Sequence, residues 1–266
     1  GLSPGLDFES QLFYKPHAQA LLRRALRTPG YRCRVLALGT NTDPYQPIER
    51  RYRVMRQLLE VLREAEHPIY ITTKSSLVER DLDLLVPMAE QNLVSVSISV
   101  TTLDHEIARI LEPRAAAPLR RMQTIARLAE AGIPVNCSVA PIIPVLTDPE
   151  MESILDAAGN AGAAGASYIL LRLPREVRDL FVEWLNAHFP DQATHVMSII
   201  RQSRQGRDND PEFGRRKRGT GVFAEIIANR FRLAVKRCGL GGKLVELDTT
   251  RFAQPAPESQ NQLTLF

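Results

Sequence analysis

Polar side chains follow two short apolar runs in the first hundred residues. The run Arg34–Leu38 leads into a polar stretch, and Lys74 directly follows the run Ile69–Thr73. The polar stretch comprises Gly39, Thr40, Asn41, Thr42 and Asp43. Its side chains can exchange hydrogen bonds with a polar ligand, and a lysine at the end of an apolar run suits a carboxylate or a phosphate. An Asx-capped turn explains only Asp43-Pro44, whereas a solvated side chain is the alternative for Lys74.

A third apolar run carries a serine at every second position. Within Val94–Val100, the residues Ser95, Ser97 and Ser99 alternate with branched apolar residues. A period of two places all three serines on one face of a strand. Serine fills a core poorly, so we expect this face to line a polar cavity. Close packing of a helix on small side chains is the alternative.

The segment Pro141-Ile142-Ile143-Pro144 predicts a rigid apolar strand end. Such a wall could hold a flat base. The alternative is that Ile142 and Ile143 belong to the core.

All these residues lie in or at the ends of predicted strands. Five apolar runs predict strands: Arg34–Leu38, Ile69–Thr73, Val94–Val100, Val135–Ile143 and Tyr168–Leu173. Stretches with helical spacing lie before and between them: Gln11–Arg27, Tyr52–Glu66, Leu77–Gln91, Ala116–Ala131 and Asp148–Ala161. The alternation predicts a parallel sheet with crossover helices, in which ligands bind at the carboxyl ends of the strands. An open doubly wound sheet is the rival of a barrel, and periodicity does not separate the two.

Composition and the absence of common motifs narrow the function classes. The chain has 266 residues, a formal charge of +4 and 44% hydrophobic residues, which suits a folded protein without disulfides or structural metals. A helix that crosses a membrane needs about 18 consecutive apolar residues, and no run in this sequence approaches that length. Neither G-x-G-x-x-G nor G-x-x-x-x-G-K-[ST] occurs, which argues against ordinary dinucleotide and P-loop enzymes. Cys33, Cys137 and Cys238 are far apart in the sequence and indicate reduced cytosolic thiols.

Five segments together resemble the radical S-adenosylmethionine (SAM) superfamily, and within it the branch related to spore photoproduct lyase, the "DNA repair photolyase" group. The segments are GTNTDPYQPIE (39–49), ITTKS (71–75), SVSISVTTLD (95–104), LEPRAAAPLRRMQTIARLAEAGIPV (111–135) and SVAPIIPVLTD (138–148). The resemblance covers roughly residues 8–240.

This resemblance implies an α/β fold, a partial (β/α)6 TIM-like barrel that binds SAM and a 4Fe-4S cluster. By position, the stretch from Gly39 to Asp43 would face the SAM amino group, and Lys74 would meet the SAM carboxylate. Ser97 or Ser99 would meet the ribose, and Ile142 and Ile143 would flank the adenine. The implied reaction cleaves SAM reductively to a 5′-deoxyadenosyl radical, which abstracts hydrogen from a substrate; a damaged nucleobase is one candidate.

The chain departs from this family in one respect. The family holds its cluster with three cysteines spaced C-x-x-x-C-x-x-C after the first strand, and this chain has no such triplet. With a first residue other than Met and a helix before the first run, this predicts a truncated copy whose first strand is missing; a pseudoenzyme is the alternative. We therefore expect no metal site and no SAM cleavage by this chain alone. Tyr45 and Cys137, at predicted strand ends, are candidates for the radical relay or donor, or else packing residues.

Two segments lie beyond the predicted barrel of residues 1–200. Segment 201–250 combines a basic loop with a small C-terminal extension, a helix at about Val222–Lys236; between residues 201 and 243, twelve Lys and Arg stand against four acids. The predicted nucleic-acid contacts are Arg215, Arg216, Lys217 and Arg218, with a solvated loop as the alternative. Segment 251–266 is predicted to be a flexible tail ending in Gln262, Leu263, Thr264, Leu265 and Phe266.

The last five residues resemble the peptide with which bacterial repair and replication proteins dock on the DNA polymerase sliding clamp. Packing of the tail on its own barrel is the alternative. We therefore expect a cytoplasmic monomer that does not contact a membrane, with DNA and the clamp as partners. The first hypothesis is a fragment of a radical SAM enzyme, and the second is a non-catalytic barrel that binds SAM and nucleic acid and is recruited to the clamp. A third, an aldolase barrel with Lys74 as a Schiff base, leaves the tail and the basic segment unexplained.

Overall fold

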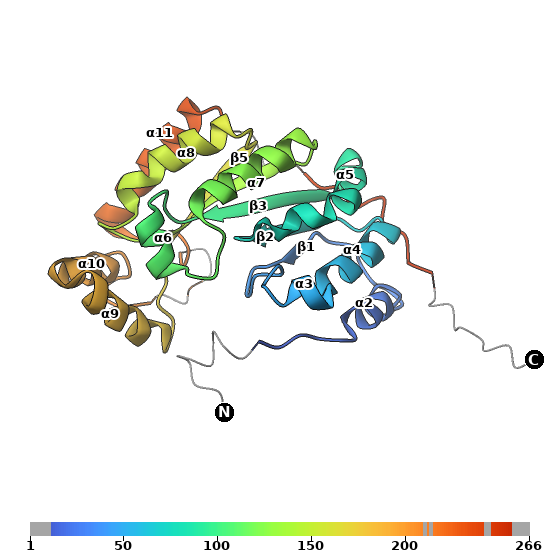
Figure 1. Cartoon of the computed structure of the whole chain (residues 1–266), viewed down its shortest axis with the longest axis horizontal. Helices are drawn as coiled ribbons and strands as arrows, with labels where there is room; N and C mark the ends of the chain where they lie inside the picture. Colours follow the sequence, from blue (N-terminus) through green and yellow to red (C-terminus); the bar gives the residue numbers. More distant parts are fainter. Residues whose placement is uncertain (1–11, 210–211, 213–214, 242–245, 257–266) are drawn as a thin grey trace, which may run out of the picture.

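The computed structural model describes residues 12–209, 212, 215–241 and 246–256. These residues form one parallel sheet of five strands with helices packed along it (Figure 1). The strands lie in the order β1-β2-β3-β4-β5, so each one neighbours the next along the chain. A doubly wound sheet reverses its strand order at a switch point, and this sheet does not. The fold is therefore α/β with the strand order of a partial TIM-like barrel.

The strands agree with the apolar runs except at the last one. They are β1 (Leu36–Leu38), β2 (Ile69–Thr73), β3 (Val94–Val100), β4 (Val135–Ile142) and β5 (Gly165–Leu170). The predicted bounds of β2 and β3 are confirmed. Strand β5 was predicted at Tyr168–Leu173 but begins at Gly165, because Gly165, Ala166 and Ser167 already pair with β4. Small residues carry little strand propensity, so the sequence pattern missed this part.

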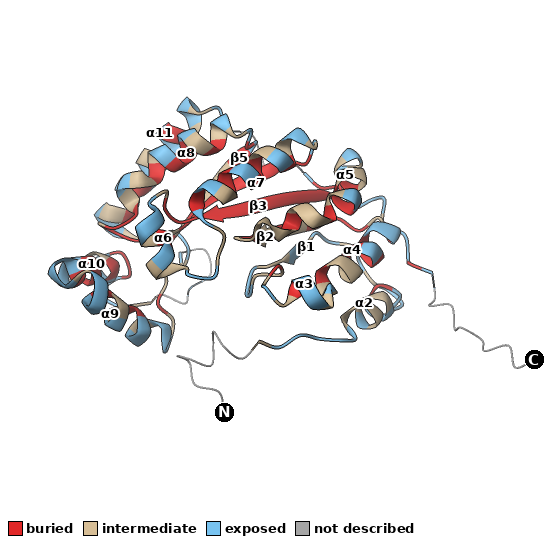
Figure 2. Cartoon of the chain, in the orientation of Figure 1, coloured by how far each residue is buried: buried red, intermediate tan, exposed pale blue. Residues whose placement is uncertain are grey.

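Crossover helices cover the outer face of the sheet and close the main hydrophobic core. They are α4 (Val54–Glu64), α5 (Leu82–Glu90), α7 (Pro118–Glu130) and α8 (Met151–Asn160). In α4, Met55, Leu59 and Leu62 follow helical spacing and are buried. Strand β3 is buried along its whole length, with helices packed on one side of it (Figure 2). In the described part of the chain, no helix combines the length and the apolar character needed to cross a membrane.

Shorter elements complete the loops of the barrel. They are α2 (Ala18–Leu26), α3 (Glu49–Tyr52), the 3-10 turn η1 (Ser76–Asp81), α6 (His105–Leu111) and the 3-10 turn η2 (Asp148–Glu150). The predicted helix at Leu77–Gln91 is therefore divided into η1 and α5, and the one at Asp148–Ala161 into η2 and α8.

Two further helices, α9 (Val177–His188) and α10 (Pro190–Gln202), were not predicted. They form a second hydrophobic cluster with Ile143 and Leu173 at the carboxyl ends of β4 and β5. Residue 200, the predicted domain boundary, falls inside α10.

The C-terminal part of the described chain packs on the barrel. Helix α11 (Gly221–Arg237) lies along α8 and β5 and contributes Ile227 and Phe231 to the main core. Residues 251–256 were predicted to be flexible, but their position is fixed by contacts with the α2–α4 region. The amide of Ala253 donates to the carbonyl of Ala65 at 3.0 Å, and the ring of Phe252 packs against Tyr31. The predicted tail residues 257–266 lie outside the described residues.

Candidate functional site

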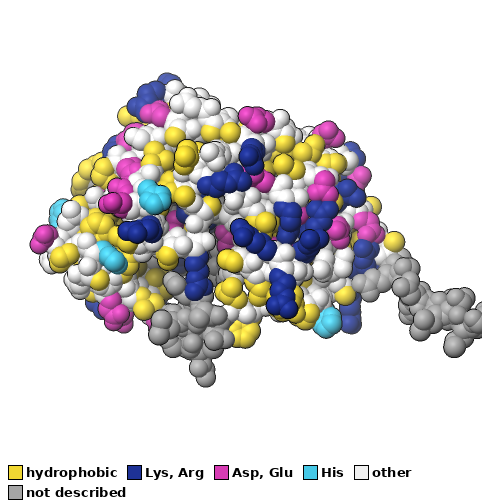
Figure 3. All heavy atoms as spheres, in the orientation of Figure 1, with side chains coloured by type: hydrophobic (Ala, Val, Ile, Leu, Met, Phe, Trp, Pro, Cys, Tyr) yellow, Lys and Arg dark blue, Asp and Glu magenta, His cyan; other side chains and the backbone are white. Residues whose placement is uncertain are grey.

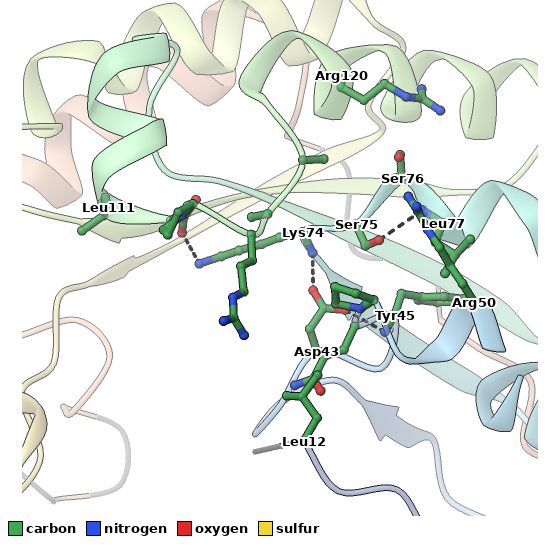
Figure 4. A pocket seen from close by; sticks show the side chains of 17 residues that line it. Leu12, Asp43, Tyr45, Arg50, Lys74, Ser75, Ser76, Leu77, Leu111 and Arg120 are labelled. Carbon is green, nitrogen blue, oxygen red and sulfur yellow. Dashed lines mark hydrogen bonds and ion pairs between the residues drawn. The ribbon is translucent and has the colours of Figure 1, made fainter. Parts of the chain in front are cut away.

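A cavity of about 560 Å³ opens at the carboxyl ends of β1 and β2. Its walls come from the loop after β1, the end of β2 and the loop after α6, as Figure 4 shows. Among the described residues, four cationic side chains line it: Arg50, Lys74, Arg114 and Arg120. On the same side of the molecule, Lys and Arg side chains gather over α3, α4 and α7 (Figure 3). The cavity therefore combines the size of a small-molecule site with a cationic rim.

Gly39 makes the turn that brings the polar stretch over the end of β2. Its φ is +85°, and a Cβ at this position would lie 2.0 Å from the carbonyl oxygen of Thr72. Only glycine can take this conformation at so close an approach. The three residues that follow, Thr40, Asn41 and Thr42, are exposed, and the described cavity lining does not include them.

Asp43 joins the loop after β1 to β2. Its carboxylate accepts hydrogen bonds from the amide of Tyr45 at 2.9 Å, the hydroxyl of Thr73 at 2.7 Å and the amide of Lys74 at 2.7 Å. The run Gly39–Asp43 thus contains the Asx turn that the sequence suggested. It also places the Asp43 carboxylate in the cavity wall. A carboxylate has about four acceptor positions, so Asp43 can still accept from a ligand.

Lys74 extends from the end of β2 along the cavity toward the loop after α6 (Figure 4). Its ammonium forms an ion pair with Glu112, whose other oxygen accepts from the guanidinium of Arg121 at 2.6 Å. The hydroxyl of Thr101, at the end of β3, donates to Glu112 at 2.9 Å. Burial alone would raise the pKa of Glu112, but the charges of Lys74 and Arg121 outweigh it and hold the pKa below its usual range.

Glu112 belongs to the segment 111–135 that carries part of the family resemblance, but the sequence pattern did not predict a role for it. Its importance arises because the ends of β2 and β3, the loop after α6 and helix α7 converge on one carboxylate. In the sequence, Glu112 is only an acidic residue that precedes a proline after a short helix. This pattern does not indicate which cationic side chains contact its carboxylate.

The serines of β3 form the predicted polar face. Val96 and Ile98 belong to the main core, so the alternating Ser97 and Ser99 point to the opposite face of the sheet. The side-chain amide of Asn136 donates to Ser97 and to a serine of β5, each at 3.0 Å. Ser97 and Ser99 are only 1% and 6% exposed, and neither is among the described residues that line the cavity. Their contact with a ribose stays a prediction.

Ile142 and Ile143 are both fully buried. Ile142 lies in the main core and Ile143 in the cluster with α9 and α10. These positions match the core alternative, and the predicted contact with adenine stays untested.

The two candidates for a radical relay or donor lie in different surroundings. Tyr45 is 2% exposed, lines the cavity, and its hydroxyl donates to Asp81 at 3.1 Å. Burial, followed by the charge of Asp81, raises the pKa of Tyr45 well above its ordinary value. Cys137 is fully buried in the main core, and burial raises the pKa of its thiol to about 12. The structure thus gives Cys137 the surroundings of a packing residue.

The basic loop is attached to the edge of the sheet. Arg204, only 2% exposed, donates to the carbonyls of Leu171 at 2.9 Å and Arg216 at 2.8 Å. The amide of Leu170 donates to the carbonyl of Lys217 at 2.9 Å. Of the predicted nucleic-acid contacts, Arg215, Lys217 and Arg218 are exposed, and Arg216 is half-buried. The cations at 215–218 are therefore held beside the carboxyl end of β5.

The cysteines do not fit an iron–sulfur cluster. Cys33 precedes β1, Cys137 lies inside β4, and the thiol of Cys238 after α11 contacts Asp156 at 2.8 Å. Within residues 12–209, 212, 215–241 and 246–256, no three His, Cys, Asp or Glu residues are grouped so that they could hold a metal ion. A 4Fe-4S cluster needs cysteine ligands, so this chain does not supply its site.

The sequence-family model of the radical SAM superfamily matches residues 12–158, which are more than half of the chain. The chain therefore belongs to this superfamily. The superfamily implies SAM and a 4Fe-4S cluster as cofactors. An uncharacterised protein of Mycobacterium tuberculosis is 36% identical over 202 residues, which are 75% of this chain and 59% of that protein. An uncharacterised protein of Methanocaldococcus jannaschii is 31% identical over 114 residues, 42% of each chain. The chain thus spans about 59% of the length of the mycobacterial relatives that it matches.

Two solved structures of mutant spore photoproduct lyases share the fold. Their TM-scores are 0.60 and 0.55, at 12% and 14% sequence identity. The match covers 86% and 83% of this chain, and 66% and 62% of theirs. At this identity the likeness establishes the fold, and the identity of the substrate has to be argued from the site.

Proposed function

We propose that this chain binds SAM in the cavity at the carboxyl ends of β1 and β2, with the amino-acid part of SAM between Asp43 and Lys74. The observation that carries the proposal is that an aspartate and a lysine from neighbouring strand ends line one cavity of about 560 Å³. The amino-acid part of SAM carries an ammonium and a carboxylate. Asp43 can accept from the ammonium and Lys74 can pair with the carboxylate, so the charges of the site fit this ligand.

We propose further that the chain is the SAM-binding part of a radical SAM enzyme. In such an enzyme a 4Fe-4S cluster would supply the electron for the reductive cleavage of SAM to methionine and a 5′-deoxyadenosyl radical. The residues of this chain bind and orient SAM, and cleavage requires cluster ligands that these 266 residues do not include. Membership of the superfamily supports this role.

Equilibrium binding of SAM tests the first part. Replacing Lys74 with Met removes the cation but keeps most of the apolar stem, so we expect at least about tenfold weaker binding. Lys236→Met, on the exposed side of α11, is the matched control and should bind SAM like the unmodified chain. Equal affinities of the Lys74 and Lys236 variants would refute the assignment.

The codons upstream of Gly1 and an anaerobic preparation of the complete reading frame test the second part. We expect a cysteine triplet in the upstream sequence, about four iron atoms per chain, and formation of 5′-deoxyadenosine from SAM under reducing conditions. A complete frame with no triplet and no iron uptake would leave only a binding role for the chain.

We also propose that a nucleic acid is the macromolecular partner and that DNA repair is the process served. Support comes from the cations at 215–218, which are fixed beside β5 by Arg204. Phosphate contacts make affinity fall with salt, with a slope of about 0.9 per contact on duplex DNA.

Fluorescence anisotropy of a labelled duplex between about 50 and 200 mM salt measures that slope. Lys217→Gln with Arg218→Gln should lower it by up to about 2. Arg24→Gln with Arg27→Gln, two exposed charges at α2, is the control with the same change in net charge. An equal loss in both double variants would point to non-specific attraction and contradict the proposed contact surface.

The sliding-clamp motif is a separate proposal from sequence. Deleting Gln262–Phe266 should abolish binding to a purified clamp while leaving SAM binding unchanged. Retention of clamp binding after the deletion would exclude this motif.

A further inference from the structure

Glu112 is a buried carboxylate placed between two cations in the wall of the cavity. Its side chain is 9% exposed, that of Arg121 is 3% exposed, and that of Lys74 is 33% exposed. Lys74 and Glu112 both line the cavity, and Lys74 is the most exposed member of the cluster. Two cations share one carboxylate, so the cluster carries one excess positive charge.

The partners of Glu112 differ in how firmly they are held. Arg121 donates to the carbonyls of Ala116 at 2.7 Å and Ser99 at 3.0 Å, in addition to Glu112. It thereby fixes the loop after α6 to the end of β3. Lys74 has a flexible four-carbon stem and a compact charge, and its side chain lines the cavity and forms an ion pair with Glu112.

We propose that Glu112 is an internal counter-ion for Lys74, which a ligand carboxylate must displace before it can pair with this lysine. The inference rests on the proposed SAM site and names the residue that sets its affinity for a carboxylate. When Lys74 turns to the ligand, Glu112 keeps the guanidinium of Arg121 and the hydroxyl of Thr101. The exchange therefore never leaves a buried carboxylate without a partner, which would be costly.

A selectivity follows from this exchange. A carboxylate ligand competes with Glu112 for the ammonium, so part of its binding energy is spent on breaking the internal pair. A ligand without a carboxylate leaves that pair intact. Weakening the ion pair between Glu112 and Lys74 should therefore raise the affinity for a ligand with a carboxylate and leave the affinity for a ligand without one unchanged.

The test compares SAM with 5′-methylthioadenosine, which has the same nucleoside and S-methyl group but a neutral thioether in place of the sulfonium and no amino-acid part. In Glu112→Gln, the amide oxygen can still accept from Arg121, and the amide NH2 can donate to the hydroxyl of Thr101, which has the carbonyl of Ala140 as its own acceptor at 3.0 Å. The ion pair with Lys74 is lost. We expect SAM to bind about two- to fivefold more tightly and 5′-methylthioadenosine to bind as before, by isothermal calorimetry. Glu106→Gln, an exposed position on α6, is the matched control and should change neither affinity.

Two further variants test the counter-ion role without relying on Glu112→Gln alone. Glu112→Asp retracts the carboxylate from Lys74 and should shift SAM affinity in the same direction. In a Lys74→Met background, Glu112→Gln should no longer alter SAM binding. Weaker binding of SAM in both Glu112 variants would mean that the acid orients Lys74, and equal weakening of both ligands would mean a structural role; either result overturns the inference.

Acetate separates this inference from the proposed function. Titration with sodium acetate should shift the backbone amide resonance of Lys74, at lower concentration in Glu112→Gln than in the unmodified chain. That outcome together with no binding of SAM would refute the SAM site and leave the counter-ion role standing. No stronger acetate response in Glu112→Gln would refute the counter-ion role even if SAM binds.

Discussion

The carboxylate of Asp43 accepts a hydrogen bond from the backbone amide of Lys74 at 2.7 Å. One proposed ligand-binding residue thus fixes the backbone of the other. The loop after β1 and the end of β2 cannot move apart without breaking this bond and the one from Thr73 at 2.7 Å. The spacing between an acceptor for the ammonium of a ligand and a donor for its carboxylate is therefore set by the sheet.

Replacing Asp43 with Asn should destabilise the protein. The amide presents one donor group to three backbone and side-chain donors, so at least one hydrogen bond is lost and a donor is left unpaired. We expect the free energy of unfolding in urea to fall by about 1–3 kcal/mol. Thr42→Ala, in the same loop but exposed, should change it by less than about 0.5 kcal/mol. Similar losses in both variants would show that Asp43 does not hold the loop.

Gly39→Ala should be more damaging than Gly30→Ala. Both glycines have positive φ, +85° and +77°, and an alanine there costs about 1–2 kcal/mol. At Gly39 the new Cβ also meets the carbonyl of Thr72, whereas at Gly30 it meets nothing within 4 Å. Thermal unfolding should therefore show a loss of about 3 kcal/mol or more for Gly39→Ala. Equal losses for the two variants would contradict the close approach of this loop to β2.

The loss of folding stability at low pH should depend on the carboxylate of Glu112. Its pKa in the folded state lies below the ordinary value of 4.5, so the ionised carboxylate stabilises the folded state at higher pH. This contribution is present above about pH 4.5 and is lost as the pH falls through the lowered pKa. In urea titrations at a series of pH values, Glu112→Gln should lose less stability on acidification than the unmodified chain. Glu90→Gln, at an exposed position on α5, should follow the unmodified chain; a Glu112→Gln curve that does so too would rule out this linkage.

Arg204 should control the accessibility of the basic loop. Lysine cannot reproduce the fork that reaches the carbonyls of Leu171 and Arg216, so Arg204→Lys leaves buried carbonyl groups unpaired at a cost of about 2–4 kcal/mol. Limited trypsin digestion should then cut faster at residues 215–218. Arg207→Lys, an exposed neighbour, should be cut at the unmodified rate. Identical cleavage in all three proteins would argue against anchoring by Arg204.

The sheet was largely predictable because β2 is a short apolar run and β3 alternates serine with branched apolar residues, and both patterns are typical of strands. Periodicity did not separate its strand order from that of a doubly wound sheet, whereas the resemblance to the superfamily implied the order of a partial barrel, which is confirmed. Strand β5 was displaced because Gly165, Ala166 and Ser167 resemble a turn in composition. Helices α9 and α10 were missed, and Pro190 at the start of α10 marks the break between them.

The site was predictable only in part. Asp43 and Lys74 could be found because each follows an apolar run in sequence. Glu112 could not, because its role depends on Lys74, Thr101 and Arg121, which come from three other segments. The burial of Cys137 was within reach of the sequence: the alternation that places Ser138 on the polar face places its neighbour toward the helices.

The segment 251–256 is anchored on the barrel beside α2 and α4. Arg23 donates to the carbonyl of Ala256 at 3.0 Å, and the amide of Ala256 donates to Glu64 at 3.0 Å. Glu64 ends α4, the helix that leads back to the start of β2, so this anchor lies at the opposite end of the strands from the cavity. Ala256, the last described residue, is therefore held away from the mouth of the cavity, and a partner protein bound beside this residue would leave that mouth free to face a substrate.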